Sequence, residues 1–220
     1  MDWTAQIDAY CERTDAAYWS EPLNAVTNAA FLVAAFVMWR RVRGQGLALP
    51  IVLVGLLAAI GIGSYLFHTH ATRWAATADT TPIGLFILTY LYAANRHFWG
   101  WPVWASLLGT AAFFPYAAAT VPVFSALPFF GISAVYWPVP LLIAAYGILL
   151  RGRVPATARG LLIGAGILCL SLVARSLDEP LCGLIPIGTH IWWHILNAIM
   201  LGWMIEVLRR HMLAARRGTQ

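Results

Sequence analysis

Four side chains in this sequence are of the types that build a metal-assisted hydrolytic site. Three are histidines, His68, His190 and His194, and the fourth is Asp79. Three neutral imidazoles leave the fourth tetrahedral position of a zinc ion open to water, which is typical of catalytic sites. Zinc makes that water acidic, and a nearby carboxylate can take its proton and pass it to a leaving group. The set therefore indicates hydrolysis of an amide or ester bond.

Helical spacing decides which of these groups can share a face. His190 and His194 are four residues apart, so both project from one side of a helix, and Ser64 and His68 share a side in the same way. His70 lies two residues beyond His68, about 200° around a helix, and is expected to point elsewhere. The Ser64 hydroxyl could donate to the oxyanion that forms when a carbonyl is attacked.

The composition is that of a membrane protein. Of 220 residues, 60% are hydrophobic and only 10% are charged, whereas soluble proteins have nearer a quarter charged. The formal net charge is +5, but all 14 basic residues are arginines, and most of them lie in short segments between apolar runs. That pattern sets membrane orientation and excludes a nucleic-acid groove.

Seven apolar runs are long enough to cross about 30 Å of hydrocarbon. The sequence therefore predicts an all-α, seven-transmembrane helix bundle forming a single domain over residues 1–220. Four prolines between residues 121 and 140 make a bent or re-entrant stretch the alternative there. The predicted spans are 22–40, 50–69, 80–96, 101–119, 131–150, 158–176 and 188–208.

The arginines orient this bundle. Eleven of them fall on one side of the predicted membrane and three on the other. The positive-inside rule then places the N-terminus outside and the C-terminus in the cytoplasm, with residues 1–21 as an acidic extracytoplasmic segment. In that arrangement the ends of three predicted spans bring His68, Asp79 and His190 to the outer surface.

Each of these residues also has a structural interpretation. The His190–His194 pair could hydrogen-bond between helices, and Asp79 could cap the start of a helix. Ser64, near Gly61 and Gly63, could simply permit close helix packing. Ionisable groups are costly near hydrocarbon, so their convergence at one depth favours a functional site.

The same residues carry a resemblance to a known family, the alkaline ceramidases, which are seven-span zinc hydrolases. The matching motifs are Cys11-Glu12, the stretch WSEPLNAVTN at residues 19–28, SYLFH at residues 64–68, Asp79 eleven residues later, and HIWWH at residues 190–194. They occur in the family's order over nearly the whole chain. The resemblance implies that His68, His190 and His194 bind zinc, that Asp79 is the catalytic carboxylate, and that Ser64 stabilises the oxyanion.

The resemblance also implies a calcium site and a disulfide near the N-terminus. Glu12, Glu21 and the carbonyl of Tyr10 match calcium ligands of the family. The family's other two ligands are replaced here by Ala9 and Thr14, for which Asp8 or Asp15 could compensate. Spacing alone favours a solvated acidic segment, because no EF-hand pattern is present. Cys11 and Cys182 match a cysteine pair that forms a disulfide in the family, on the oxidising side of the predicted topology.

The sequence therefore predicts a zinc-dependent membrane amidase that cleaves ceramide into a sphingoid base and a fatty acid. The alternatives are a hydrolase of another acyl lipid and a receptor-like protein with structural zinc. The predicted partner is a membrane lipid, with no nucleic acid and no protein partner inferred. The all-arginine composition and short loops are typical of a bacterial inner-membrane protein with its site facing the extracytoplasmic side.

Overall fold

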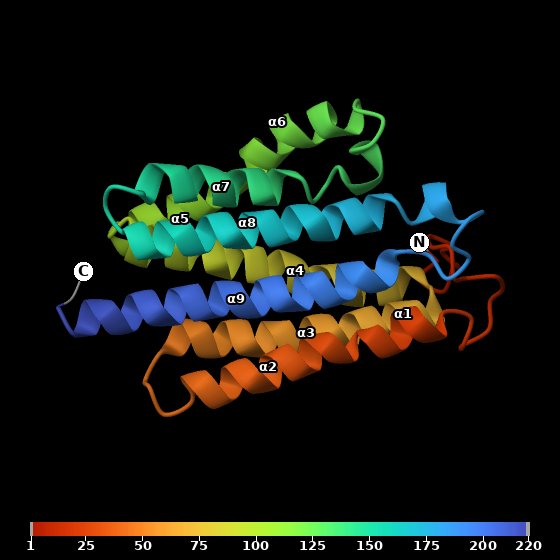
Figure 1. The fold of residues 1–220 in the computed structure, drawn as a ribbon, viewed down its shortest axis with the longest axis horizontal. Helices are drawn as coiled ribbons and strands as arrows, with labels where there is room; N and C mark the ends of the chain where they lie inside the picture. Colours follow the sequence, from red (N-terminus) through yellow and green to blue (C-terminus); the bar gives the residue numbers. More distant parts are fainter. Residues whose placement is uncertain (1, 219–220) are drawn as a thin grey trace.

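The chain folds into a bundle of helices, which confirms the predicted all-α class. A computed structural model describes residues 2–218, shown as a ribbon in Figure 1. The α-helices described are α1 (Pro22–Thr27), α2 (Ala29–Val42), α3 (Ala48–His70), α4 (Arg73–Ala93), α5 (Val103–Ala111), α6 (Phe113–Ser125), α7 (Pro138–Leu150), α8 (Pro155–Ser176) and α9 (His190–Arg216). A short π-helical stretch, Ala94–Phe98, extends α4.

Each predicted span corresponds to a helical segment. Helices α1 and α2 continue one another across Asn28, and α5 and α6 across Ala112, so the described helices form seven segments. Five of these are long and apolar enough to cross a membrane: Pro22–Val42, Ala48–His70, Val103–Ser125, Pro155–Ser176 and His190–Arg216. Multiple helices of this kind make the chain an integral, multi-pass membrane protein.

The other two segments differ from the predicted spans 80–96 and 131–150. Helix α4 begins seven residues earlier than predicted, at Arg73, because its first turns are polar and hydropathy does not mark them. Asp79 therefore lies inside the helix, and its interpretation as a helix cap is wrong. Helix α7 begins only at Pro138, since proline favours the first turn of a helix and interrupts a helix further in.

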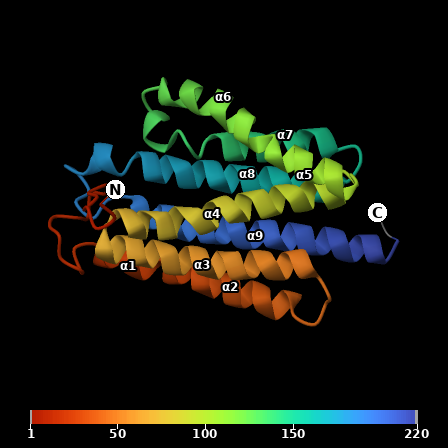
Figure 2. The same cartoon turned by 180° about the vertical axis from the view of Figure 1, so that it is seen from behind.

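Helix α9 is the central element of the bundle. It packs against α8 on one side and against α2 and α3 on the other, and it contributes the core residues Met204, Ile205 and Leu208. Helices α3 and α4 lie side by side along their lengths, as the view from behind in Figure 2 shows. The last turn of α3, the first turns of α4 and the first turn of α9 therefore meet at one end of the bundle (Figure 1).

The closest approach of α3 and α4 depends on a missing side chain. Pro82 in α4 has no N–H, so the carbonyl of Ala78, four residues earlier, loses its intrahelical donor. That carbonyl lies against Gly63 of α3, where an added Cβ would collide with Ala78 and approach Cα of Asp79 to 3.0 Å. The contact brings the backbone of Asp79 against the turn of α3 that carries Ser64.

The N-terminal segment covers this end of the bundle. Ala71 ends α3 in the left-handed conformation, with φ of 46°, and its carbonyl accepts a hydrogen bond from the backbone of Ile7 at 2.7 Å. The backbone N–H of Arg73 in turn donates to the carbonyl of Ala5 at 3.1 Å. These bonds satisfy backbone groups at the α3–α4 junction. They also fix the N-terminal segment at the end of the bundle where the histidines lie.

Candidate metal centre

The three predicted histidines lie together, buried among the helix ends. His68 comes from the last turn of α3, and His190 and His194 come from the first two turns of α9. Their nearest ligand atoms all lie within 4.8 Å of one another, and each side chain is at most 1% exposed. His70 packs instead between Tyr18 and Trp74, as its position on the helix predicts.

Hydrogen-bond partners at Nδ1 orient two of these histidines. Nδ1 of His68 lies 2.6 Å from Oε2 of Glu21, and a carboxylate can only accept, so this nitrogen donates. Nδ1 of His194 lies 2.8 Å from the hydroxyl of Thr27, which also lies 2.7 Å from the carbonyl of Leu23. With both Nδ1 atoms engaged in this way, the Nε2 atoms of the two rings are directed at each other.

The two rings also face one another. The Nε2 atoms of His68 and His194 lie only 3.1 Å apart. Two ligands of a tetrahedral zinc ion at its usual bond length are about 3.3 Å apart. A cation could be coordinated by both nitrogens at this separation, so the residues present fit a metal ion.

His190 completes the cluster from a different environment. Its ring stacks on Tyr10 with the centroids 3.8 Å apart, and its Nδ1 is buried without a hydrogen-bond partner among the described residues. The sequence predicted only the carbonyl of Tyr10 as a functional group, whereas it is the ring that contacts the cluster. Arg175 lies beyond this ring, 6.0 Å from its centroid.

The predicted catalytic pair lies beside the histidines. The side chains of Ser64 and Asp79 lie near each other, and the carboxylate of Asp79 is also within electrostatic range of His68 and Arg175. Ser64 is buried and Asp79 half-buried. Among the described residues, the metal-binding cluster contains only the three histidines, so Asp79 stands outside it.

Glu21 is the acidic partner of the cluster. It is 2% exposed, and its Oε1 accepts a hydrogen bond from Nε of Arg13 at 2.5 Å while Oε2 contacts His68. Burial alone would raise the pKa of Glu21, but the hydrogen bonds from His68 and Arg13 hold the pKa below its ordinary value. An ionised Glu21 therefore increases the basicity of His68 as a ligand.

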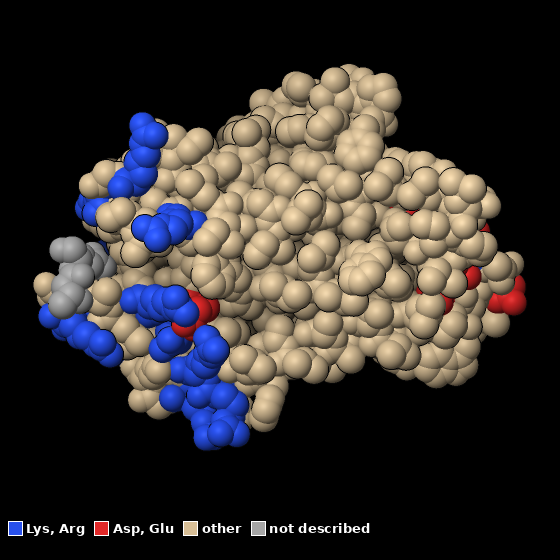
Figure 3. All heavy atoms as spheres, in the orientation of Figure 1, with Lys and Arg blue, Asp and Glu red and all other residues tan. Residues whose placement is uncertain are grey.

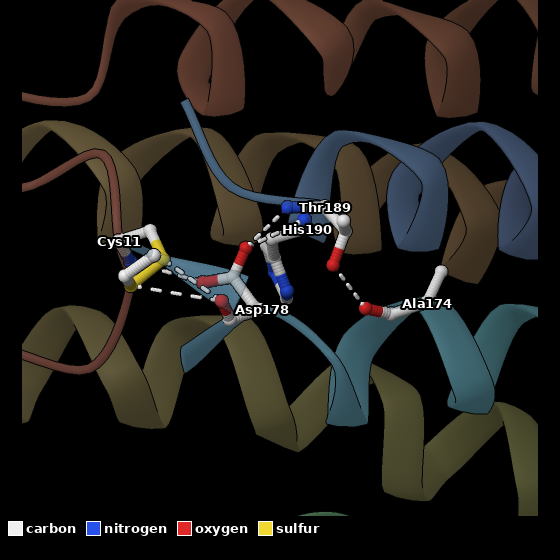
Figure 4. Close-up of a disulfide and its surroundings, with 6 residues drawn as sticks. Cys11, Ala174, Asp178, Thr189 and His190 are labelled. Atoms are coloured by element: carbon white, nitrogen blue, oxygen red, sulfur yellow. Dashed lines mark hydrogen bonds between the residues drawn. A yellow bond between two sulfur atoms is a disulfide. The ribbon is translucent and has the colours of Figure 1, made fainter. Parts of the chain in front are cut away.

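The disulfide links the N-terminal segment to the loop before α9. Cys11 and Cys182 are bonded in the structure, and Cys169 is free. In Figure 4 the adjoining carboxylate of Asp178 points toward both segments: it accepts from the backbone N–H groups of Cys11 at 2.9 Å and His190 at 2.8 Å. It also accepts from Thr189, and so caps α9 at the residue that begins the HIWWH motif.

Sequence reasoning missed the groups that orient the histidines. Thr27 belongs to the motif at residues 19–28, and Asp178 lies four residues before Cys182, but neither had an assigned role. Glu21, which was expected to bind calcium, contacts His68. No periodicity could have paired these residues, because each contact joins segments from different parts of the chain.

An almost entirely apolar cavity begins beside the cluster. It runs along α9 from Trp193 to Met204, a rise of about 16 Å, between α3, α4, α7 and α8. Tyr136 lines it near the histidines, and Tyr146 lines it farther along, hydrogen-bonded to Asn95 at 2.7 Å. The cavity extends along α9 and is apolar, so its chemistry suits a hydrocarbon chain.

An apolar helix bundle that buries three histidines beside a carboxylate defines an integral membrane protein with a candidate metal site. The comparison with protein families agrees: the family model described as Ceramidase matches residues 2–219. The chain belongs to the ceramidase family, which implies a hydrolase and a ceramide-like lipid substrate. No curated protein matches the chain closely enough to count as a relative.

Proposed function

We propose that this chain is a zinc-dependent amidase that hydrolyses the amide bond of a ceramide-like lipid, releasing a sphingoid base and a fatty acid. The observation that carries the proposal is the buried cluster of three histidines, in which the Nε2 atoms of His68 and His194 face one another 3.1 Å apart. Family membership supports the substrate class.

Each polar group of the site has a distinct role in this proposal. His68, His190 and His194 hold the ion, which supplies Lewis acidity and makes water acidic enough to attack near neutral pH. Asp79 takes the proton from the attacking water and returns it to the amide nitrogen as that bond breaks. Ser64 donates to the carbonyl oxygen as negative charge develops there.

The composition of the cluster favours catalysis over a structural metal role. A structural zinc site is closed by four protein ligands. Among residues 2–218, no fourth histidine, cysteine, aspartate or glutamate joins the three histidines. A zinc ion held by these three histidines would keep one position for water, and Asp79 lies nearby without joining the ligand set.

The apolar cavity supports an acyl lipid as the substrate. Trp193 and Tyr136 line its end beside the cluster, so a lipid whose carbonyl lies at the histidines could place its hydrocarbon chain between them and along α9. Burial of each methylene is worth about 0.8 kcal/mol, so a long chain would contribute strongly to binding.

We also propose that the site faces the extracytoplasmic side of a bacterial inner membrane. In Figure 3 the visible arginines gather at the end of the molecule that carries the C-terminus, and most visible carboxylates lie at the other end. The positive-inside rule places the arginine-rich end in the cytoplasm and the histidine cluster outside. Cysteines joined near that cluster agree with an oxidising compartment.

The test combines metal analysis with lipid turnover. Purified protein is expected to carry about one zinc ion per chain and to release fatty acid from a fluorescent ceramide. The variant His190→Ala with His194→Ala should lose both. Full zinc occupancy in this variant would contradict the assigned ligands. Turnover of a matched acyl ester but not of ceramide would replace the proposed substrate by another acyl lipid.

A further inference from the structure

Arg13 holds an unusual position for a charged side chain. It is 8% exposed, although it belongs to the acidic N-terminal segment. Its Nε donates to Oε1 of Glu21 at 2.5 Å, its Nη1 to the carbonyl of Asp15 at 3.0 Å, and its Nη2 to the carbonyl of His68 at 3.0 Å. The guanidinium is therefore surrounded by three oxygens, two from the N-terminal segment and one from the last turn of α3.

Carboxylate and carbonyl oxygens that converge in this way are also the ligands of hard cations. The positions expected to bind calcium, however, already have donors. The carbonyl of Tyr10 accepts from the backbone N–H of Arg13 at 3.2 Å. The two carboxylate oxygens of Glu12 accept from the backbone of Leu23 at 2.7 Å and of Asn24 at 2.8 Å.

The remaining calcium expectations fit no better. Asp8 and Thr14 are exposed, and Glu21 is shared between Arg13 and His68. A divalent ion at Glu21 would have to lie beside the guanidinium, where like charges repel in a poorly solvated site. The residues present do not fit a calcium site.

We propose that Arg13 is a built-in substitute for a bound cation, so that the protein holds its N-terminal segment over the histidines without calcium. The guanidinium ties Glu21 to the last turn of α3, in which His68 lies. It thereby keeps Oε2 of Glu21 directed at Nδ1 of His68. Arg13 is a positioning residue that acts on the metal through Glu21, and in this respect the inference rests on the proposed zinc site.

The first arm of the test uses the wild-type protein alone. Elemental analysis should find no calcium after purification, and millimolar calcium chloride should leave the melting temperature unchanged, in zinc-loaded and zinc-free samples alike. About one calcium ion per chain, or a melting temperature that rises with calcium, would overturn the proposal.

The second arm compares Arg13→Met with Arg73→Met, which removes an exposed arginine at the start of α4. Loss of a residue that orients a ligand typically weakens metal binding 10- to 100-fold. Zinc transfer to a colorimetric chelator should therefore be at least about tenfold faster for Arg13→Met and unchanged for Arg73→Met. Equal rates and equal melting temperatures in the two variants would refute the role of Arg13.

A third variant guards against misfolding. Arg13→Lys keeps the charge but cannot reach three oxygens in three directions, and it should release zinc at an intermediate rate. If the wild-type protein bound no zinc, the proposed function would fail. The calcium arm and the melting temperatures of the zinc-free variants would still decide whether Arg13 acts as the internal cation.

Discussion

Nδ1 of His68 lies 2.6 Å from Oε2 of Glu21, although the two residues are 47 positions apart in the sequence. The contact joins the histidine cluster to the N-terminal segment, because Glu21 also binds Arg13. A carboxylate behind a ligating histidine fixes the tautomer and makes the other nitrogen a better metal ligand. The N-terminal segment is therefore part of the proposed metal site and contacts one of its histidines directly.

This contact predicts the effect of Glu21→Gln. The amide keeps the size of the side chain but removes the charge that favours His68 as a ligand, so zinc affinity should fall about 10- to 100-fold. Competition with a chelator of known affinity measures the change. Glu12→Gln is the control, because Glu12 caps α1 and does not contact the histidines. This substitution should lower the free energy of unfolding by about 1 kcal/mol without altering zinc affinity. Equal zinc affinities for the two variants would contradict the prediction.

Asp79→Asn separates catalysis from metal binding. The amide keeps the size and polarity of the side chain but cannot accept the proton of the attacking water. Hydrolysis of fluorescent ceramide should fall about 10²- to 10⁴-fold. Because Asp79 stands outside the histidine cluster, zinc content by elemental analysis should be unchanged. Loss of zinc together with activity would make Asp79 a ligand and favour a structural metal.

Gly63→Ala tests the close approach of α3 and α4. The added methyl group collides with the carbonyl of Ala78, so the helices must separate and carry Ser64 away from Asp79. Overpacking of this kind typically costs about 1–3 kcal/mol, and both the melting temperature and the hydrolysis rate should fall. Gly55→Ala in the same helix meets nothing within 4 Å and should leave both unchanged. A Gly63→Ala variant as active as Gly55→Ala would disprove this account of the packing.

Ala94→Leu tests the apolar cavity as an acyl-chain site. Ala94 lines the cavity together with Met204 and Tyr146, away from the histidines. A larger side chain there should raise the KM for long-chain ceramides while short-chain substrates are still hydrolysed. Turnover of a series of acyl-chain lengths measures the shift. Ala118→Leu, on the exposed surface of α6, is the control and should preserve the original preference.

The sequence predicted helices better than it predicted their ends. Hydropathy located all seven helical segments, because a helix that spans a membrane requires a continuous run of apolar residues. It placed the start of α4 at residue 80 instead of Arg73, since polar residues in a buried turn look like a loop. The span predicted over residues 131–150 is also shorter in the structure, because helix α7 begins only at Pro138.

The candidate site divides in a similar way. The sequence could identify the three histidines because their helical spacing and the predicted membrane depth place them together. They are His68, His190 and His194. The sequence could not identify the hydrogen-bond partners of these histidines, because Thr27 and Glu21 contact them only through tertiary packing. The calcium expectation followed the identity of acidic residues, whereas the structure shows that Arg13 and backbone N–H groups occupy their oxygens.

The disulfide has a consequence for biosynthesis. Cys11 and Cys182 are 171 residues apart, and the facing histidines His68 and His194 are 126 apart. A chain made from its N-terminus inserts most of its helices before either pair can form. Products that stop short of α9 lack His190 and His194 and cannot form the three-histidine cluster. Under the proposed function, a prematurely ended chain is therefore inert, and hydrolytic competence appears only when synthesis is nearly complete.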